Sequence, residues 1–352
     1  MAKHTIEELY QWQSLPLNVK VLMTKERIRE WVREYGIDGV YVSFSGGKDS
    51  TVLLHIAREM YPEIKAVFVD TGLEYPEIRE FVKTFDNVDW LKPKMTFKQV
   101  IEKYGYPFIT KEVSDCVYSS KKYYEKGDCN LKQPARLKKL LGTLEHKEKG
   151  VLTGEKSNMY DRSRYLFLLG AHFPISSKCC DVMKKEPVHK YGKKTGRKPL
   201  TAQMASESKQ RARQWLVNGC NGFDMKEPIS NPMAFWTEQD VLLYIKENNI
   251  GIASVYGDVV FECEQEVQLS MADFGIFDKE RQSLKTTGCE RTGCMFCGYG
   301  CHLEKSPNRF ERMKETHPKI YDYIMRPTEQ GGLNYKEIID WINEHGNMSI
   351  KY

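Results

Sequence analysis

The sequence predicts an α/β protein with a doubly wound parallel sheet, followed by a cysteine-rich C-terminal segment. Short runs of β-branched and aromatic residues occur at 39–44, 66–69 and 88–91, and helical patterns follow them at 49–61, 76–85 and 97–104. Strands that alternate with helices at this spacing favour a parallel sheet covered on both faces. In this architecture, ligands bind at the carboxyl ends of the strands.

Length and composition limit the remaining possibilities. With 352 residues, 41% of them hydrophobic, the chain can form one large domain with an appendage, or two domains. The net charge of +5 permits a polyanionic partner without requiring one. The longest apolar-rich stretch, residues 165–175, is too short to span a bilayer, so we expect a cytoplasmic protein with no membrane partner. In that compartment the ten cysteines are expected to serve metal, cluster or thiol chemistry rather than disulfides.

Changes of pattern along the chain divide it into three segments. Residues 1–37 are predicted to be an N-terminal helical arm, because apolar residues recur at helical spacing over 5–35 with an interruption at Pro16. Residues 38–260 are the expected α/β domain, with a basic insert at about 111–150. Within the insert, residues 121–149 hold nine Lys and Arg against four acidic residues. The insert is either a mobile lid or polyanion contact, or a solvated helical hairpin. Residues 261–352 are the cysteine-rich and helical C-terminal segment.

Three further elements are expected beyond these repeats. Residues 152–155 and 200–204 are predicted to be further strand ends. A helix is expected after Thr237, with Thr237 as its N-cap and Asp240 at the third helical position. The pattern at 335–341 predicts an amphipathic helix.

The stretch Ser43–Ser50, "SFSGGKDS", joins the first predicted strand to an apolar helix. Glycines let backbone N–H groups converge on an anion, the helix N-terminus adds a favourable dipole, and Lys48 adds a charge. A Walker A loop is excluded, because that loop has four residues before its Gly-Lys and a Ser or Thr after the lysine, where this chain has Asp49. A carboxylate beside phosphates needs a divalent cation, so Asp49 is expected to contact Mg²⁺. Asp70 ends the next strand, at the same edge of the sheet.

This combination of residues resembles the PP-loop nucleotide α-hydrolase superfamily, whose "SGGxDS" loop binds the pyrophosphate of ATP. "VFVDTGLEYPE" at 67–77, "ASESKQRARQWL" at 205–216 and "PISNPMAFWTEQDVLLYI" at 228–245 resemble its sulfonucleotide reductase branch. The resemblance covers roughly residues 38–300 and implies an adenine nucleotide α-hydrolase-like fold. The nucleotide-binding residues that it implies are Ser43, Ser45, Gly46, Gly47, Lys48, Asp49, Ser50, Asp70, Thr71, Gly72 and Ser208. The catalytic residues that it implies are Lys48, Asp49 and Arg211.

The cysteines are similar to a second feature of this branch. "SKCCDVMKKEP" at 177–187 resembles the paired-cysteine element of adenylylsulfate reductases, which holds a [4Fe–4S] cluster together with a later Cys-x-x-Cys. The matching residues are Cys179, Cys180, Cys294 and Cys297, and thiolates suit iron–sulfur ligation. Cys289 and Cys301 are alternative ligands, and Zn²⁺ is the alternative metal. The isolated cysteines, expected to be small buried hydrophobes, are Cys116, Cys129, Cys220 and Cys263.

Two departures from the reductase branch affect the predicted reaction. Reductases that accept an activated sulfonucleotide usually have a degenerate loop, whereas "SGGKDS" is intact, and Ala202 and Met204 replace the glycine and the basic residue usual before Ser208. Their nucleophilic cysteine lies in a C-terminal tail, whereas no cysteine follows Cys301 here. These departures favour cleavage of ATP to AMP and pyrophosphate in an iron–sulfur-dependent sulfur transfer. The basic insert would suit a nucleic-acid substrate.

Two alternatives to this adenylation reaction stay open. The first is a sulfonucleotide reductase that uses Cys301 or Cys289 as its nucleophile and thioredoxin as its reductant. The second is a non-catalytic nucleotide or nucleic-acid binding module with structural zinc. Both enzyme hypotheses require an adenine nucleotide and a protein that donates sulfur or electrons.

Overall fold

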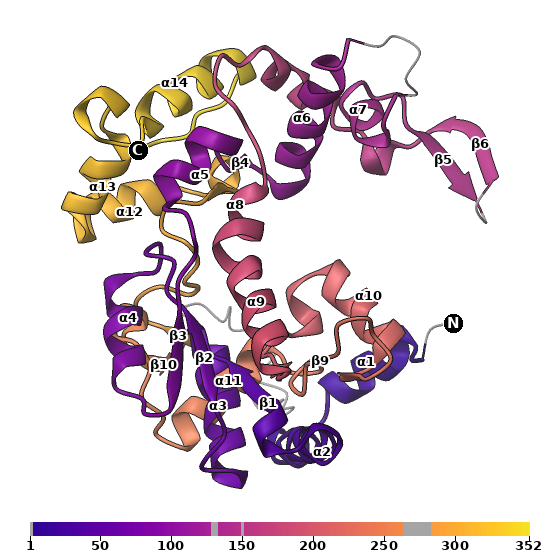
Figure 1. Ribbon diagram of the computed structural model, residues 1–352, viewed down its shortest axis with the longest axis vertical. Coiled ribbons are helices and arrows are strands. Elements are labelled where there is room, and N and C mark those ends of the chain that lie inside the picture. The colour runs from indigo at the N-terminus through magenta and orange to yellow at the C-terminus, as the bar shows by residue number, and fades with distance from the viewer. Residues whose placement is uncertain (1–2, 128–132, 149–150, 263–282) are drawn as a thin grey trace, which may run out of the picture. The chain divides into compact units, whose positions relative to one another are not determined.

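The computed structural model describes residues 3–127, 133–148, 151–262 and 283–352 of the chain. The chain forms two compact units, each with its own elements (Figure 1). Unit 1 consists of Met1–Asp70, Glu74–Lys92 and Val188–Gly293, and unit 2 consists of Thr71–Leu73, Pro93–Pro187 and Cys294–Tyr352. Segments far apart in the sequence therefore build each unit.

Unit 1 contains the predicted parallel sheet. Its strands run in the order β3-β2-β1-β7-β9-β8, and every neighbouring pair is parallel except β8 and β9. The strands are β1 (Val40–Ser43), β2 (Ala66–Val69), β3 (Val88–Leu91), β7 (Lys198–Leu200), β8 (Asn221–Gly222) and β9 (Ile229–Ser230). The α/β prediction is confirmed, since the connections between the parallel strands are helical crossovers.

Helices cover both faces of this sheet. Val40 and Val42 of β1 belong to the larger core with α2 and α3, whereas Tyr41 between them packs with Val67 and Tyr191 in a second core on α9. Alternate residues of a strand point to opposite faces, so Val40, Tyr41 and Val42 of β1 are all buried because helices cover both faces. The helices are α1 (Ile6–Gln13), α2 (Leu17–Tyr35), α3 (Lys48–Met60), α4 (Pro76–Lys83), α9 (Glu186–Thr195), α10 (Lys209–Asn218) and α11 (Glu238–Glu247).

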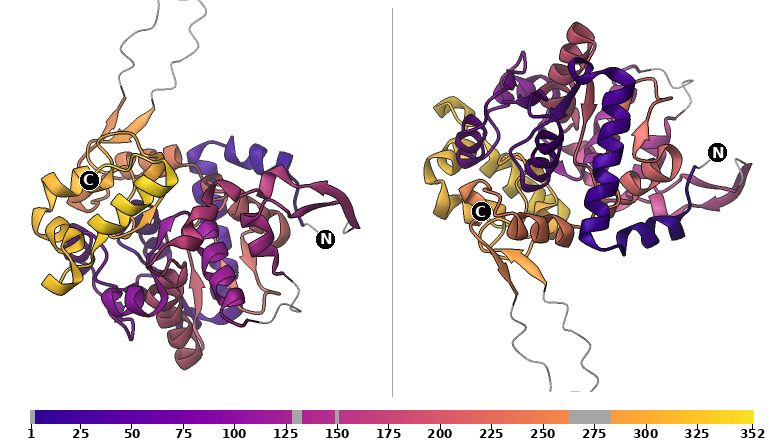
Figure 2. Two further views of the ribbon diagram at one scale, coloured as in Figure 1. Left: turned by 90° about the horizontal axis from the view of Figure 1, so that it is seen from above. Right: turned by 90° about the horizontal axis from the view of Figure 1, so that it is seen from below.

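The N-terminal helices are part of the unit 1 core. Pro16 separates α1 from α2, as the sequence predicted, because proline cannot continue the hydrogen-bond pattern of a helix interior. Ile28 and Trp31 of α2 are fully buried in the same core as Val40 and Val42 of β1. Figure 2 shows α2 as the long indigo helix in its right-hand view. Unit 1 also contains the antiparallel pair β10 (Val259–Phe261) and β11 (Leu284–Thr286).

Unit 2 is largely helical. Its parallel pair, β4 (Phe108–Ile109) with β12 (Gly298–Tyr299), joins the middle of the chain to the cysteine-rich stretch. Its helices are α5 (Phe97–Tyr104), α6 (Lys111–Tyr124), α7 (Ala135–Leu140), α8 (Lys178–Cys180), α12 (Arg309–Thr316), α13 (Pro318–Met325) and α14 (Tyr335–Gly346). The predicted helix at 335–341 is the first part of α14. In the part of the chain that the structure describes, no helix is long and apolar enough to cross a membrane.

One predicted strand end belongs to a hairpin and not to the parallel sheet. Residues 152–155 lie in β6 (Val151–Lys156), which pairs antiparallel with β5 (Glu145–Glu148) in a separate hairpin and not in the parallel sheet. The connection between β5 and β6 is short, which permits only antiparallel pairing, since a parallel partner requires a longer crossover. Figure 1 shows this hairpin projecting beyond α7. By contrast, 200–204 does follow a strand of the sheet, β7.

Candidate nucleotide site and thiol group

The phosphate loop of unit 1 runs from the end of β1 to the start of α3. Gly46 has a φ of +71°, and a Cβ atom there would lie 2.7 Å from Val82 Cγ2 and 2.8 Å from Ile78 Cγ2 of α4. Both the backbone angle and the close approach of α4 require glycine at this position. The loop is thus tightly packed on α4.

Two serines close the loop. Ser50 Oγ accepts a hydrogen bond from the backbone N–H of Ser45 at 3.1 Å and donates to the carbonyl of Gly47 at 2.9 Å. The hydroxyls of Ser45 and Ser50 lie 3.0 Å apart. These contacts fix the backbone at the N-terminus of α3, where an anion would bind. Ser43 is the last residue of β1 and positions the start of the loop.

Lys48 is buried, with 4% of its surface exposed. Its ammonium pairs with the carboxylate of Glu238, at the start of α11, and donates to the carbonyl oxygen of Glu290 at 2.7 Å. In this arrangement the lysine charge is already compensated, so a phosphate must compete with Glu238 for it. Glu238 lies within "WTEQD", which the sequence indicated only as a helix start. Thr237 and Asp240 do form the predicted cap there.

Asp49 and Asp70 each have one buried carboxylate oxygen without a hydrogen-bond partner among the described residues. The second oxygen of Asp70 accepts from Arg79 Nη2 at 2.9 Å. Burial raises the pKa of Asp49, and the nearby charges of Lys48, Arg291 and Arg211 oppose that rise. Unpaired buried carboxylate oxygens are uncommon, and a hard divalent cation bound by oxygen ligands would satisfy them. This observation fits the Mg²⁺ contact predicted for Asp49.

Ser208 and Arg211 lie at the start of α10 in unit 1. Ser208 Oγ caps the helix by accepting from the backbone N–H of Arg211 at 3.3 Å. The guanidinium of Arg211 pairs with Glu207, which also accepts from Arg291 Nη2 at 3.2 Å. Burial, and then the charge of Arg291, lowers the pKa of Arg211. Two arginines on one carboxylate leave a net positive charge near Asp49.

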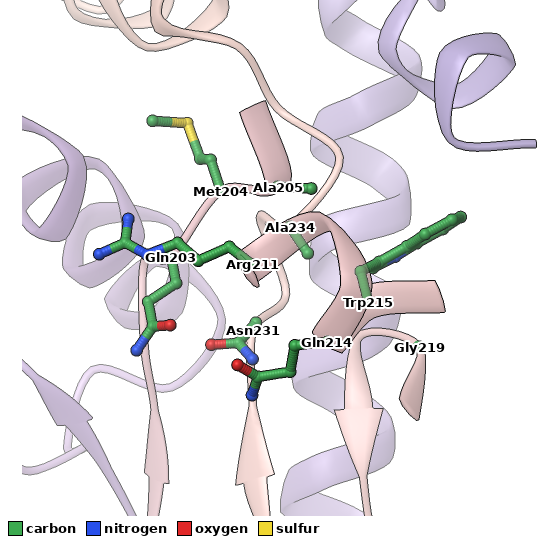
Figure 3. Close-up of a pocket in the computed structure, with 9 residues that line it drawn as sticks. All are labelled: Gln203, Met204, Ala205, Arg211, Gln214, Trp215, Gly219, Asn231 and Ala234. Carbon is green, nitrogen blue, oxygen red and sulfur yellow. The ribbon is translucent and has the colours of Figure 1, made fainter. Parts of the chain in front are cut away.

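Arg211 also lines a small hollow beside α10 (Figure 3). The hollow has a volume of about 10 Å³, which is room for about one water molecule. In Figure 3 the side chains of Arg211 and Trp215 point to opposite sides of the hollow. The hollow is too small for a nucleotide base, so it is not assigned as a ligand pocket.

The segment Gly288–Gly293 contacts the phosphate loop within unit 1. Besides the Glu290 carbonyl on Lys48, Thr292 Oγ1 lies 2.5 Å from the hydroxyl of Tyr256, and that hydroxyl would be 3.3 Å from a Cβ atom on Gly47. Sequence reasoning missed Arg291, Tyr256 and Glu238 as members of this site. The sequence signal for Arg291 was the Arg-Thr pair inside "GCERTGC". That stretch was interpreted from the spacing of its cysteines, so the pair was not considered as part of the site.

The other predicted residues of "VDTG" belong to unit 2. Thr71 is buried, and its hydroxyl accepts from the backbone N–H of Leu73 at 3.2 Å. Gly72 has a φ of +72°, a conformation that favours glycine. The boundary between the units therefore falls directly after Asp70.

Unit 2 contains all four predicted cluster ligands. Cys179 Sγ donates to Cys180 Sγ at 4.0 Å, and this hydrogen bond raises the pKa of Cys179 and lowers the pKa of Cys180. The charges of Cys297 and Cys294 add to the rise at Cys179. The backbone N–H of Cys297 donates to the carbonyl of Cys294 at 3.1 Å, forming a tight turn.

The donor set suits an iron–sulfur cluster, since it consists of thiols. Within the described ranges, however, no three His, Cys, Asp or Glu side chains are grouped closely enough to hold a metal ion. The cluster and the zinc alternative therefore remain proposals.

The remaining cysteines differ in exposure and in the unit to which they belong. Cys301 is 1% exposed, donates to the carbonyl of Gly298 at 2.9 Å, and has its pKa raised to about 12 by burial. Cys289 is half-buried and belongs to unit 1, where its backbone N–H donates to the carbonyl of Val255 at 2.9 Å. Cys116 and Cys220 are buried, as the sequence predicted. Cys129 and Cys263 lie outside the described residues.

Comparisons with known proteins agree with the family indicated by these motifs. The model of the phosphoadenosine phosphosulfate reductase domain matches residues 39–155 and 134–299. An uncharacterised protein of Methanocaldococcus jannaschii is 39% identical over 82 residues, 22% of this chain and 19% of that protein. A phosphoadenosine 5'-phosphosulfate reductase of Xylella fastidiosa is 33% identical over 72 residues, 20% of this chain and 30% of that protein. The chain thus spans less than a third of the length of these two relatives.

A solved structure was also matched. The crystal structure of phosphoadenylyl-sulfate reductase from Candida auris, in complex with phosphate, aligns over 71% of this chain and 90% of the other, at 15% identity and a TM-score of 0.36. The family model covers more than half of the chain, including the phosphate loop, the Ser208–Arg211 element and the Cys-x-x-Cys. This chain belongs to the phosphoadenosine phosphosulfate reductase domain family.

Proposed function

We propose that this chain is an oxidoreductase that reduces the sulfate group of an adenylylated sulfate, with Cys289 as the nucleophilic thiol. Family membership and the reductase name of the Xylella fastidiosa relative support this reaction. The observation that carries it is the position of Cys289. It is one residue before Glu290, whose carbonyl accepts from Lys48 of the phosphate loop, so a half-exposed thiol lies in the same unit as the nucleotide loop.

The proposed reaction has two steps. The Cys289 thiolate attacks the sulfur of the sulfonucleotide, an S–S bond forms, and the adenosine phosphate leaves with the electron pair of the broken S–O bond. A dithiol protein of the thioredoxin class then attacks the cysteine sulfur of that bond, sulfite leaves, and the dithiol becomes a disulfide while Cys289 is restored as a thiol. Arg211 and Arg291 would balance the charge of the sulfonate group.

The contrast with Cys301 supports the choice of thiol. Thiolates are the reacting species, and Cys301 is buried with its pKa raised to about 12, which leaves it almost wholly protonated at neutral pH. Cys289 is the alternative that the sequence left open, and its exposure permits contact with a reductant protein.

Adenylation by ATP is the second candidate, and the unpaired oxygens of Asp49 and Asp70 favour it. These carboxylates would hold Mg²⁺, which when bound neutralises charge on a leaving pyrophosphate. The intact loop would bind that pyrophosphate, and Lys48 would exchange Glu238 for a phosphate oxygen. In this reaction Cys179, Cys180, Cys294 and Cys297 would be the ligands of a [4Fe–4S] cluster, which supplies iron for sulfur or electron transfer.

Two product assays on anaerobically purified protein distinguish the candidates. The protein is given adenylyl sulfate, or its 3'-phosphorylated form, with a thioredoxin-class reductant, and sulfite is measured. It is separately given ATP and Mg²⁺, and pyrophosphate is measured. Reduction predicts sulfite that falls to background in Cys289→Ser and persists in Cys301→Ser. The opposite pattern in the two variants would show that Cys289 is not the nucleophile.

The other outcomes identify the remaining hypotheses. Pyrophosphate release without sulfite, lost in Asp49→Asn, would replace reduction by adenylation. Neither product, together with bound zinc and no iron, would indicate a binding module with structural metal.

A further inference from the structure

A hollow of about 420 Å³ lies in unit 2 between α6, α7 and the segment Ser177–Lys185. Figure 1 shows α6 and α7 side by side at this place. The cations of its lining are Lys111, Lys122, Arg136, Lys178 and Lys185. Its carboxylates are Asp115 and Asp181, so the lining has an excess of three positive charges. This hollow is separate from the nucleotide loop of unit 1.

The two carboxylates are already engaged. Asp115 accepts from Ser177 Oγ at 2.6 Å and pairs with Arg136 Nη2 at 2.7 Å. Asp181 pairs with Lys185 at 2.8 Å and lies 3.9 Å from Lys178. They therefore hold the cations in place but cannot neutralise the whole set.

Lys111 and Lys122 supply the remaining charge. Over the part of the chain that the structure describes, no carboxylate oxygen lies within ion-pair distance of Lys111, at the first turn of α6. Lys122 pairs at 2.7 Å with Glu125, which is exposed and does not line the hollow. Exposed pairs of this kind contribute little, so both ammonium groups are available to an anion.

The neutral lining suits a phosphate ester. Ser119 and Ser177 place hydroxyls in the hollow, and Tyr118 adds an aromatic ring. Ammonium, guanidinium and hydroxyl groups are the usual donors to phosphate oxygens in nucleic-acid complexes. The volume lies within the range of small-ligand sites and exceeds what a single oxyanion fills. Beyond the lining, Tyr124 at the end of α6 is also largely exposed, as a base-stacking residue must be.

We propose that this hollow binds a phosphate ester, supplied either as a free nucleotide or as a phosphodiester of single-stranded nucleic acid. The shared chemistry is a phosphate held by Lys111, Lys122 and Arg136, with the sugar or base against Tyr118. This proposal does not depend on the reaction proposed for unit 1.

Fluorescence anisotropy and calorimetry on the full chain test the proposal with two probes, an oligothymidylate of roughly ten nucleotides and thymidine monophosphate. Thymine probes avoid an adenine-nucleotide site in unit 1. The test variant is Lys111→Gln with Lys122→Gln. The matched control is Lys305→Gln with Lys336→Gln, two exposed lysines of unit 2 outside the hollow. Both double variants remove two positive charges from exposed positions, so neither is expected to disturb folding.

The expected result is a loss of affinity of roughly tenfold in the test variant and none in the control. For the oligonucleotide, the slope of log affinity against log salt should also fall by about 1.4, since each phosphate contact with a single strand contributes about 0.7. If the loss affects the oligonucleotide, the source of the phosphate is nucleic acid, and if it affects only thymidine monophosphate, the source is a free nucleotide. Equal affinities of the two doubles for both probes would overturn the proposal.

Discussion

Gly46 shows how a single residue fixes the phosphate loop. Its positive φ and its contact with Ile78 and Val82 are separate constraints. Gly196 has nearly the same φ, +75°, but open space around it, so it isolates the first constraint. We expect Gly46→Ala to lower the free energy of unfolding by about 1–3 kcal/mol more than Gly196→Ala, because only Gly46→Ala also overpacks the contact with α4. Urea unfolding of the two variants measures the difference, and equal losses would show that α4 adjusts freely.

Asp49 is a buried carboxyl whose ionisation is expected to reduce stability. Because burial raises its pKa, the folded protein holds this proton more tightly than the unfolded chain does. The resulting stability is fully present below the ordinary carboxyl pKa of about 3.9 and is lost as the pH rises through the raised pKa. Asp49→Asn is therefore expected to unfold at a higher denaturant concentration than the wild type at neutral pH, with the gain absent in strong acid.

The same variant tests the metal contact. Mg²⁺ with an adenine nucleotide should stabilise the wild type and not Asp49→Asn, because the amide cannot replace a carboxylate ligand. Asp38→Asn is the control, since its side chain is 99% exposed in the same unit. If Asp49→Asn were less stable than the wild type at neutral pH, the attraction of Lys48 and the arginines would outweigh burial, contrary to the direction of the pKa shift.

At the scale of elements, the start of α11 compensates the charge of Lys48 in the phosphate loop. Glu238 pairs with Lys48, so an incoming phosphate has to displace a carboxylate. Glu238→Gln should tighten nucleotide binding by about two- to fivefold, the range expected for releasing one partly exposed ion pair. Glu247→Gln at the other end of α11 is the matched control, and titration calorimetry gives both dissociation constants. Weaker binding in Glu238→Gln would mean that Glu238 itself contacts the ligand or its metal.

The elements themselves were largely predictable from local pattern. The bounds of β2, β3 and α5 match the predicted runs at 66–69, 88–91 and 97–104, because apolar periodicity and caps such as Thr96 act within a few residues. The prediction of a strand end at 152–155 did not specify which strand it pairs with, because pairing is not a local property. The short connection to β5 determines its partner strand. The residue pattern of 152–155 alone is the same for a strand of the sheet and a strand of a hairpin.

At the scale of the whole molecule, the sequence could not show which segments share a unit. "GCERTGCMFCGYGC" reads as one cysteine-rich loop, yet residues up to Gly293 contact the phosphate loop while Cys294 onward belongs to unit 2. The site residues Glu238, Arg291 and Tyr256 come together only through tertiary packing. Motif spacing predicts only sites built from neighbours in sequence, such as the phosphate loop and the paired cysteines.

The division into units leads to a prediction for the thiol group. Cys179 and Cys180 lie more than a hundred residues before Cys294 and Cys297, yet all four belong to unit 2. A cluster bound by them would cross-link these segments, so its loss should destabilise unit 2 by more than it affects unit 1. We expect Cys180→Ser to lose most of its iron and acid-labile sulfide after anaerobic purification, whereas Cys220→Ala, a buried cysteine of unit 1, keeps both.

Hydrogen exchange locates the effect. Amides of the β4–β12 pair should exchange faster in Cys180→Ser than in the wild type, and amides of β1 and β2 should not change, because those strands belong to the core of unit 1. Removing metal from the wild type with a chelator should reproduce the same pattern. Full iron content in Cys180→Ser would exclude Cys180 as a ligand, and zinc in place of iron in the wild type would assign the four thiols to a structural metal site.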